Sequence, residues 1–288
     1  NHFMARAYRK NLDKLRKIIQ LFERASNLLK YQKYTINIQN VSQDIDQLCD
    51  TELLLLPIAY EGHAISLIQF KNLLIRCDRG ENSREEGSIV VYQMQHPERW
   101  TTALVKELLY TKQQKNFIQE GIQSFLGLER IANIPITNQI IGNCSWANIE
   151  ASILVLLYLL QWDQITNISQ AIEKDIHSAE FYNHWVKWDK TRALEVCFKQ
   201  FEYAEPARRA TIAMLLGAVL FQACRYENPQ EVKIALKLIP ILMVPEYQYI
   251  LNSYLEIYWY KNKTQAGHNL MQLLNVAGVM LPAHQRLS

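Results

Sequence analysis

The sequence predicts an α+β fold, in which a small mixed sheet packs against a helix and is joined to an all-helical C-terminal domain. Four short segments between residues 52 and 94 are rich in Leu, Ile and Val and are separated by turn-forming residues, which is typical of a strand meander. From residue 145 onward, apolar residues recur at helical spacing instead. Pro206, Pro229 and Pro245 stand where the first turn of a helix tolerates proline.

These patterns divide the chain into three regions. They are residues 1–40, with a basic amphipathic helix over 5–31; residues 41–165, the mixed core; and residues 166–288, the helical domain. The core begins with a short helix over 42–49, for which we expect Ser42 to be the N-terminal cap. The predicted strands are Glu52–Tyr60, Ala64–Phe70, Leu73–Cys77 and Ser88–Met94.

Helices are expected on both sides of the loop that ends in Ile134-Pro135-Ile136-Thr137. Those of the core cover about 99–110, 113–126 and 145–161. Those of the helical domain cover about 164–175, 190–203, 206–226, 229–238, 246–261 and 263–276.

The net charge of +3 hides an asymmetry along the chain. Residues 1–34 contain nine Lys and Arg against two acidic residues, whereas the remainder contains 22 against 26. No basic run with interleaved aromatic residues is present, so we expect no nucleic-acid binding. The basic cluster fits a solvated helix face, with attachment of residues 5–33 to an acidic membrane surface as the alternative. The longest apolar run, Ala151–Leu160, which is broken only by Ser152, is too short to span a bilayer.

The five cysteines stand far apart, at positions 49, 77, 144, 197 and 224. No two of them have zinc-ligand spacing, and an odd, scattered set is not a disulfide framework. We therefore expect a reducing, cytoplasmic location, with no metal and no cofactor.

One predicted hairpin brings a histidine close to an aspartate. If Lys71-Asn72 forms a two-residue turn, Phe70 faces Leu73 and the same register places His63 diagonally across from Asp78. Diagonal neighbours have Cβ atoms roughly 7–8 Å apart, which an imidazole–carboxylate hydrogen bond can span. Such a carboxylate would fix the tautomer of the ring and orient it as a base. The alternative is an unrelated strand-end His and a turn Asp.

A second segment, Asn138 to Asn148, places a cysteine where a polar loop meets an apolar helix. At a helix N-terminus the dipole and free N–H groups stabilise a thiolate, so Cys144 is the predicted nucleophile. The Cys144 N–H and the Gln139 side-chain amide are the predicted donors of an oxyanion hole, and Asn138 and Asn143 are alternative donors. An inert core cysteine is the competing interpretation, which fits Cys49, Cys197 and Cys224 better.

The order His63, Asp78, Gln139, Cys144 resembles that of the circularly permuted papain-like peptidases, which include the SUMO/ubiquitin-like proteases and adenoviral-type proteinases. The residues around His63, Asp78 and Cys144 look most like cysteine-protease-like domains of effectors injected by intracellular bacteria. The resemblance covers roughly residues 50–160. It implies a papain-like core with His63, Asp78 and Cys144 as catalytic residues and Gln139 at the oxyanion.

The implied function is thiol-dependent hydrolysis of a peptide or isopeptide bond in a host protein, in the host cytosol. Ubiquitin or a ubiquitin-like protein is the implied partner. Two alternatives stay open: an acetyltransferase on the same fold, and a non-catalytic interaction module that keeps a protease-like core. The papain order is less favoured, because His177, His184, His268 and His284 all lie in predicted helices or tails. In the helical domain, aromatic residues such as Tyr258, Trp259 and Tyr260 are candidates for partner recognition.

Overall fold

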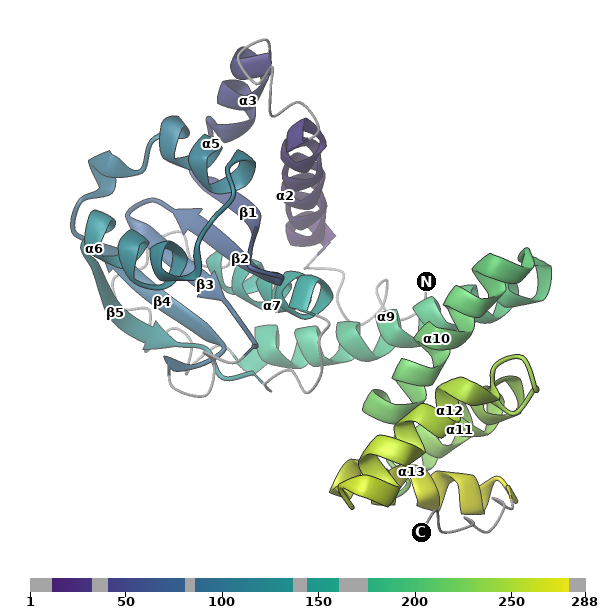
Figure 1. Cartoon of the computed structure of the whole chain (residues 1–288). Helices are drawn as coiled ribbons and strands as arrows, with labels where there is room; N and C mark the ends of the chain where they lie inside the picture. The colour runs from purple at the N-terminus through teal and green to yellow at the C-terminus, as the bar shows by residue number, and fades with distance from the viewer. Residues whose placement is uncertain (1–11, 33–40, 81–85, 137–143, 161–175, 280–288) are drawn as a thin grey trace. The chain divides into compact units, whose positions relative to one another are not determined.

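The structure is a computed structural model that describes residues 12–32, 41–80, 86–136, 144–160 and 176–279. The chain divides into two compact units, residues 1–186 and 187–288. The predicted boundary between residues 165 and 166 falls outside the described residues. Figure 1 shows the strands gathered in the first unit and helices α10 to α13 in the second.

The first unit is built on a five-stranded sheet with the order β1-β2-β3-β4-β5. Its strands are β1 Leu53–Tyr60, β2 His63–Phe70, β3 Leu73–Cys77, β4 Ile89–Met94 and β5 Leu128–Asn133. All four pairings between these strands are antiparallel, so the prediction of a mixed sheet was wrong. The prediction also missed β5, because this edge strand has mostly exposed side chains and no alternation of apolar and polar residues.

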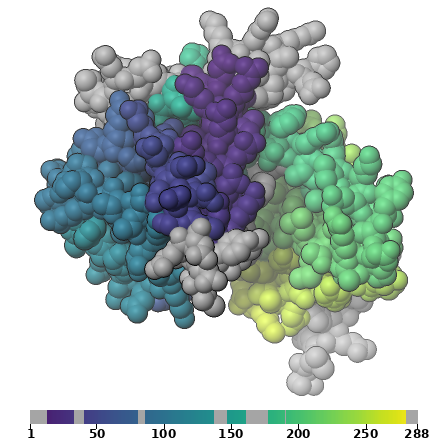
Figure 2. Space-filling view, turned by 90° about the horizontal axis from the view of Figure 1, so that it is seen from above, coloured from purple at the N-terminus to yellow at the C-terminus, as the bar shows by residue number. Residues whose placement is uncertain are grey.

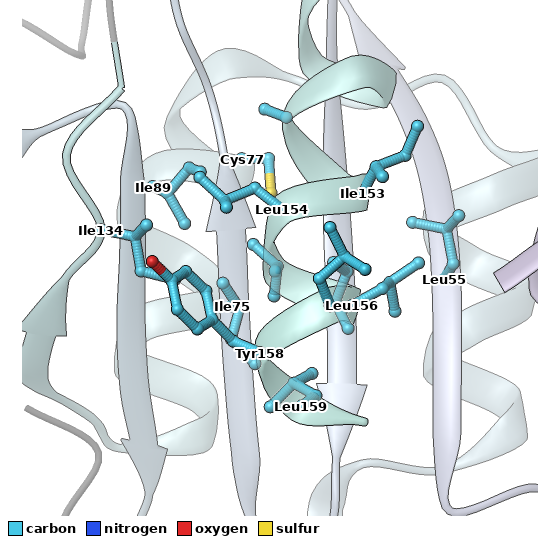
Figure 3. Close-up of a cluster of buried hydrophobic side chains, with 14 of the residues drawn as sticks. Leu55, Ile75, Cys77, Ile89, Ile134, Ile153, Leu154, Leu156, Tyr158 and Leu159 are labelled. Atoms are coloured by element: carbon cyan, nitrogen blue, oxygen red, sulfur yellow. The ribbon is translucent and has the colours of Figure 1, made fainter. Parts of the chain in front are cut away.

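One face of the sheet packs against α7, Cys144–Leu159 (Figure 3). Leu55 on β1, Ile75 on β3 and Ile89 on β4 meet Leu154 and other α7 side chains in one buried cluster. Every residue from 151 to 159 is buried, so this stretch of α7 is enclosed on all sides. The enclosing side chains include Ile18 and Ala25 of α2 and Phe181 and Tyr182 of α9. An apolar helix without a polar face requires this environment.

The other face of the sheet is covered by shorter helices between β4 and β5. They are η3 Pro97–Arg99, α5 Thr102–Tyr110, the π-helix η4 Phe117–Gly121 and α6 Ile122–Leu126. Thr101 caps α5 through its side chain, which accepts a hydrogen bond from the Leu104 N–H at 3.3 Å. Within the helix predicted over 113–126, residues Phe117–Gly121 form the wider turns of a π-helix.

Two of the described helices precede the sheet in the first unit: α2 Leu12–Lys30 and α3 Ser42–Cys49. Figure 2 shows both helices on the surface, in purple and dark blue. Just after α2, the Tyr31 hydroxyl donates a hydrogen bond to the Asp44 carboxylate of α3 at 3.3 Å. Ser42 is the first helical residue and not the cap, because Val41 holds that position without a side-chain hydrogen bond. The prediction of Ser42 as the cap was wrong by one residue.

Helix α9, Ile176–Tyr203, begins in the first unit and continues into the second. The second unit also contains α10 Pro206–Ala223, α11 Pro229–Leu242, α12 Gln248–Tyr254, the π-helix η5 Leu255–Lys261 and α13 Gln265–Val276. The ring of Phe221 stacks on Tyr254 with 4.5 Å between centroids. Tyr258, Trp259 and Tyr260 are all partly exposed, as expected for three consecutive helical residues. The predicted helix over 164–175 lies outside the described residues. None of the helices that the structure describes is long and apolar enough to cross a membrane.

The enclosure of α7 generates a prediction about stability. Leu156→Ala should lower the free energy of unfolding by about 2–5 kcal/mol, since Leu156 is fully buried between α7 and the sheet. The control is Ile19→Ala on α2, where the side chain is 55% exposed and the cost should stay below about 1 kcal/mol. Urea unfolding followed by tryptophan fluorescence measures both. Equal costs for the two substitutions would contradict this packing.

Candidate active site

His63 and Asp78 meet at one end of the sheet. His63 is the first residue of β2 and Asp78 follows the last residue of β3. The predicted register of this hairpin is confirmed, from Phe70↔Leu73 to Ser66↔Cys77. The predicted contact is present as well: His63 Nε2 lies 2.8 Å from Asp78 Oδ1. The His63 side chain is 26% exposed and that of Asp78 1%, so the carboxylate is hidden behind an imidazole that reaches solvent.

Among the described residues, Tyr60 and Gly80 restrict the imidazole ring of His63. The ring of Tyr60 meets it edge-on, with 5.4 Å between centroids and 78° between planes. On the side of Asp78, Gly80 approaches so closely that a Cβ there would lie 2.6 Å from His63 Cε1. The Gly80 N–H also donates to Asp78 Oδ1 at 3.0 Å. Any larger residue at position 80 would push the ring away from the carboxylate.

The Asp78 carboxyl is held in its charged form. Burial alone would raise its pKa, but hydrogen bonds from His63 and from the Gly80 N–H lower it, as do the positive charges of His63 and Arg76. The net effect is a pKa below the usual 3.8. An ionised Asp78 accepts the Nε2–H of His63, so a neutral ring carries its lone pair on Nδ1.

Asn148, one turn into α7, connects the helix to both strands of the hairpin. Its side chain is 1% exposed. The carboxamide oxygen accepts the backbone N–H of Arg79 at 2.7 Å, and the carboxamide nitrogen donates to the carbonyl of Ala64 at 2.5 Å. Arg79 follows Asp78 and Ala64 follows His63. Asn148 thus ties the start of α7 to the residues that directly follow His63 and Asp78.

A second polar contact to α7 comes from Arg79 itself. Its guanidinium donates to the Ala147 carbonyl at 3.4 Å and lies 4.0 Å from the Glu150 carboxylate. The hydroxyl of Tyr182 on α9 donates to Glu150 at 3.5 Å. Burial and the charge of Glu150 raise the pKa of Tyr182, which keeps this hydroxyl protonated as a donor.

Cys144 is the first residue of α7, which begins one residue before the predicted start at 145. Its side chain lies outside the described part of the structure, and so does Gln139. Their assignment as nucleophile and oxyanion donor stays a prediction. In the helix, Cys144 precedes Asn148 by four residues, roughly 6 Å along the axis. The backbone of Cys144 therefore lies one turn from the residue that contacts Ala64 and Arg79.

The other four cysteines are free thiols in settings that disfavour the thiolate. Burial raises the pKa of Cys49 to about 11 and of Cys77 and Cys224 to about 12, with smaller contributions from acidic neighbours. Burial also raises the pKa of Cys197. These thiols are poor nucleophiles near neutral pH.

Sequence reasoning missed the roles of Asn148, Gly80 and Tyr60. A signal for Asn148 was present: an asparagine early in an otherwise apolar helix must find partners when that helix is buried. Gly80 gave no such signal, because a glycine after Asp-Arg also fits an ordinary turn. Tyr60 was read only as the end of a strand.

Comparison with known proteins found similarity among solved structures. No protein-family model matches the chain, and no curated protein matches it significantly. Among solved structures, the Legionella effector AnkH is 34% identical, with a TM-score of 0.68. The chain is similar to a bacterial effector. The similarity covers 96% of this chain but only 58% of the AnkH chain, so this sequence spans less than two thirds of that protein's length.

The charged state of Asp78 generates a prediction about pH. A carboxyl whose pKa is lowered by folding adds stability that is present above its unfolded pKa and lost as the pH falls through the folded value. Asp78→Asn should therefore cost about 1–3 kcal/mol of unfolding free energy at pH 7, and the difference from wild type should shrink as the pH falls below 3.8.

Urea unfolding at pH 7, 4 and 3 measures this difference. The control is Asp50→Asn, an exposed carboxylate at the end of α3, which should change the free energy by less than about 0.5 kcal/mol. A cost of Asp78→Asn that is constant or grows toward pH 3 would show that the charge of this carboxyl does not support the fold.

Proposed function

We propose that the chain is a thiol-dependent hydrolase in which Cys144 attacks a peptide or isopeptide bond, His63 transfers protons and Asp78 orients His63. The observation that carries this proposal is the 2.8 Å hydrogen bond between His63 Nε2 and the buried, ionised Asp78. It fixes one ring nitrogen as donor and gives the other the lone pair of a base. A thiol nucleophile is activated by such an oriented base next to it.

The position of Cys144 supports the same proposal. It opens α7, where the helix dipole and unpaired backbone N–H groups favour a thiolate. One turn later, Asn148 fixes the helix against Ala64 and Arg79, which flank the two members of the dyad along the chain. The proposal requires the Cys144 thiol to reach Nδ1 of His63 from this first turn.

The chemistry balances with these groups alone. The Cys144 sulfur forms a bond to the carbonyl carbon, its proton passes to His63 Nδ1, and the carbonyl oxygen becomes an oxyanion facing the Cys144 N–H and Gln139. The C–N bond then breaks and the leaving amine takes the proton from His63. Water attacks the carbonyl carbon of the resulting thioester and gives one proton to His63, and the C–S bond breaks to release the carboxylic acid and the Cys144 thiolate. Cys144 finally recovers that proton.

The similarity to AnkH supports the setting in which this chemistry would act. AnkH is a Legionella effector, and 96% of this chain matches 58% of AnkH at 34% identity. We therefore propose that the chain is a bacterial effector, or part of one, that works in the cytosol of a host cell. Its substrate would then be a host protein, and a ubiquitin-like conjugate is the first class to test.

The direct test uses electrophilic probes. Ubiquitin with a C-terminal vinyl sulfone, the matching SUMO probe and an epoxysuccinyl peptide should each be tried on the full chain, with adducts mapped by mass spectrometry. At least one should form an adduct on Cys144. His63→Ala should slow this reaction by about 10²–10⁴-fold, because the base is lost. Cys144→Ala should abolish it.

The matched control is Cys197→Ala, which removes a thiol with a raised pKa on α9 and should leave adduct formation unchanged. Adducts on Cys144 that form equally fast without His63 would contradict the proposed dyad. If none of the three probes reacts at Cys144, the hydrolase proposal fails.

A further inference from the structure

The ladder between β2 and β3 ends two pairs before it reaches Ala64. Paired residues have numbers that sum to 143, from Phe70↔Leu73 to Ser66↔Cys77. Continued in this register, Ala64 would stand opposite Arg79. The two strands instead separate after Ser66 and Cys77, at the end of the sheet where His63 and Asp78 lie.

The backbone pattern shows which bond the separation removes. Phe70 and Leu73 close a two-residue turn, and such a closing pair exchanges both of its backbone hydrogen bonds. In an antiparallel ladder every second pair does the same. Ala64 and Arg79 are three such steps away, so an unbroken ladder would direct the Arg79 N–H at the Ala64 carbonyl.

The Asn148 carboxamide occupies the place of that bond. Its oxygen accepts the Arg79 N–H at 2.7 Å and its nitrogen donates to the Ala64 carbonyl at 2.5 Å. Of the two bonds that such a pair exchanges, the one from the Arg79 N–H to the Ala64 carbonyl is thus replaced by two bonds through a side chain of α7. A carboxamide between the strands holds them further apart than the usual 4.7–4.9 Å spacing.

We propose that Asn148 is a positioning residue, a wedge that sets the separation of His63 and Asp78 and holds both against the first turn of α7. Without it, the Arg79 N–H would bind the Ala64 carbonyl directly and draw Asp78 toward Ile65, the residue it would face in the extended ladder. The position of Asn148 between the two strands follows from its hydrogen bonds to Arg79 and Ala64. Its relevance to thiol chemistry rests on the proposed function.

The first test detects the His63–Asp78 hydrogen bond by NMR and requires no chemical reaction. The His63 Nε2–H that bonds to Asp78 should give a downfield proton resonance, assigned by its loss in His63→Ala. Asn148→Ala should abolish or shift this resonance. The control is Leu156→Ala, which disrupts the packing of α7 on the sheet at a position distant from the dyad and should leave the resonance in place. Thermal melting of each variant confirms that it is folded at the temperature used.

The second test uses Asn148→Asp and iodoacetamide. When the new carboxyl is protonated, its carbonyl can accept from Arg79 and its O–H can donate to Ala64, as the carboxamide does. When it is ionised, the donor to Ala64 is gone and two acceptors face each other. Burial favours the protonated form of such a carboxyl and shifts its pKa upward, toward the working range of pH.

In the part of the chain that the structure describes, charged groups approach this position from three segments. They are His63 at the start of β2, Asp78 and Arg79 after β3, and Glu150 on α7. They are the same in wild type, so the ratio of the variant's Cys144 alkylation rate to the wild-type rate cancels their direct effect on the thiol. We expect a ratio near one at pH 5 that falls about tenfold or more by pH 8.

The outcomes separate this inference from the proposed function. If wild-type Cys144 is alkylated rapidly while Asn148→Ala keeps the resonance and Asn148→Asp shows a flat ratio, the wedge is overturned and the hydrolase stands. If the resonance depends on Asn148 while wild-type Cys144 reacts like an ordinary thiol, the wedge stands and the hydrolase fails.

Discussion

The enclosure of α7 is the constraint on which the rest of the first unit depends. Nine consecutive buried residues, from 151 to 159, place apolar side chains in every direction around the helix axis. Each large side chain contributes roughly 1.5–3 kcal/mol by leaving water, and no single neighbouring surface can cover them all. The sheet, α2 and the start of α9 therefore close around this helix. Apolar packing thus fixes the direction of α7 and the place where it ends, independently of its polar contacts.

The described part of α7 divides sharply by polarity, and this division connects fold to function. Asn148, Glu150 and Ser152 lie in its first half and are all buried, whereas residues 153–159 are apolar. Buried polar groups need partners. Asn148 and Glu150 have theirs at the open end of the β2–β3 hairpin, in the Arg79 N–H, the Ala64 carbonyl and the Arg79 guanidinium, whereas the Ser152 hydroxyl donates to the Asn148 carbonyl at 2.9 Å. The apolar half anchors the helix, and the polar half aligns its N-terminus with the His63–Asp78 pair.

Much of this arrangement could be predicted, because local signals and tertiary structure agree. The Lys71-Asn72 turn sets the hairpin register, and that register places His63 near Asp78. Other features depend on tertiary partners that a single sequence does not reveal. Strand β5 is held mainly by pairing with β4, not by its own pattern. The π turns Phe117–Gly121 and Leu255–Lys261 have no distinct sequence periodicity, so they were read as ordinary helix.

The central claim is that His63 and Asp78 activate Cys144 and no other thiol. Competitive alkylation with iodoacetamide at pH 6, mapped across all five cysteines, tests it most directly. Burial raises the pKa of Cys49, Cys77, Cys197 and Cys224, so they should react slowly. Cys144 should react first, and His63→Ala should bring its rate down toward theirs. If Cys144 reacts no faster than Cys197, or if its rate is the same without His63, the account is contradicted.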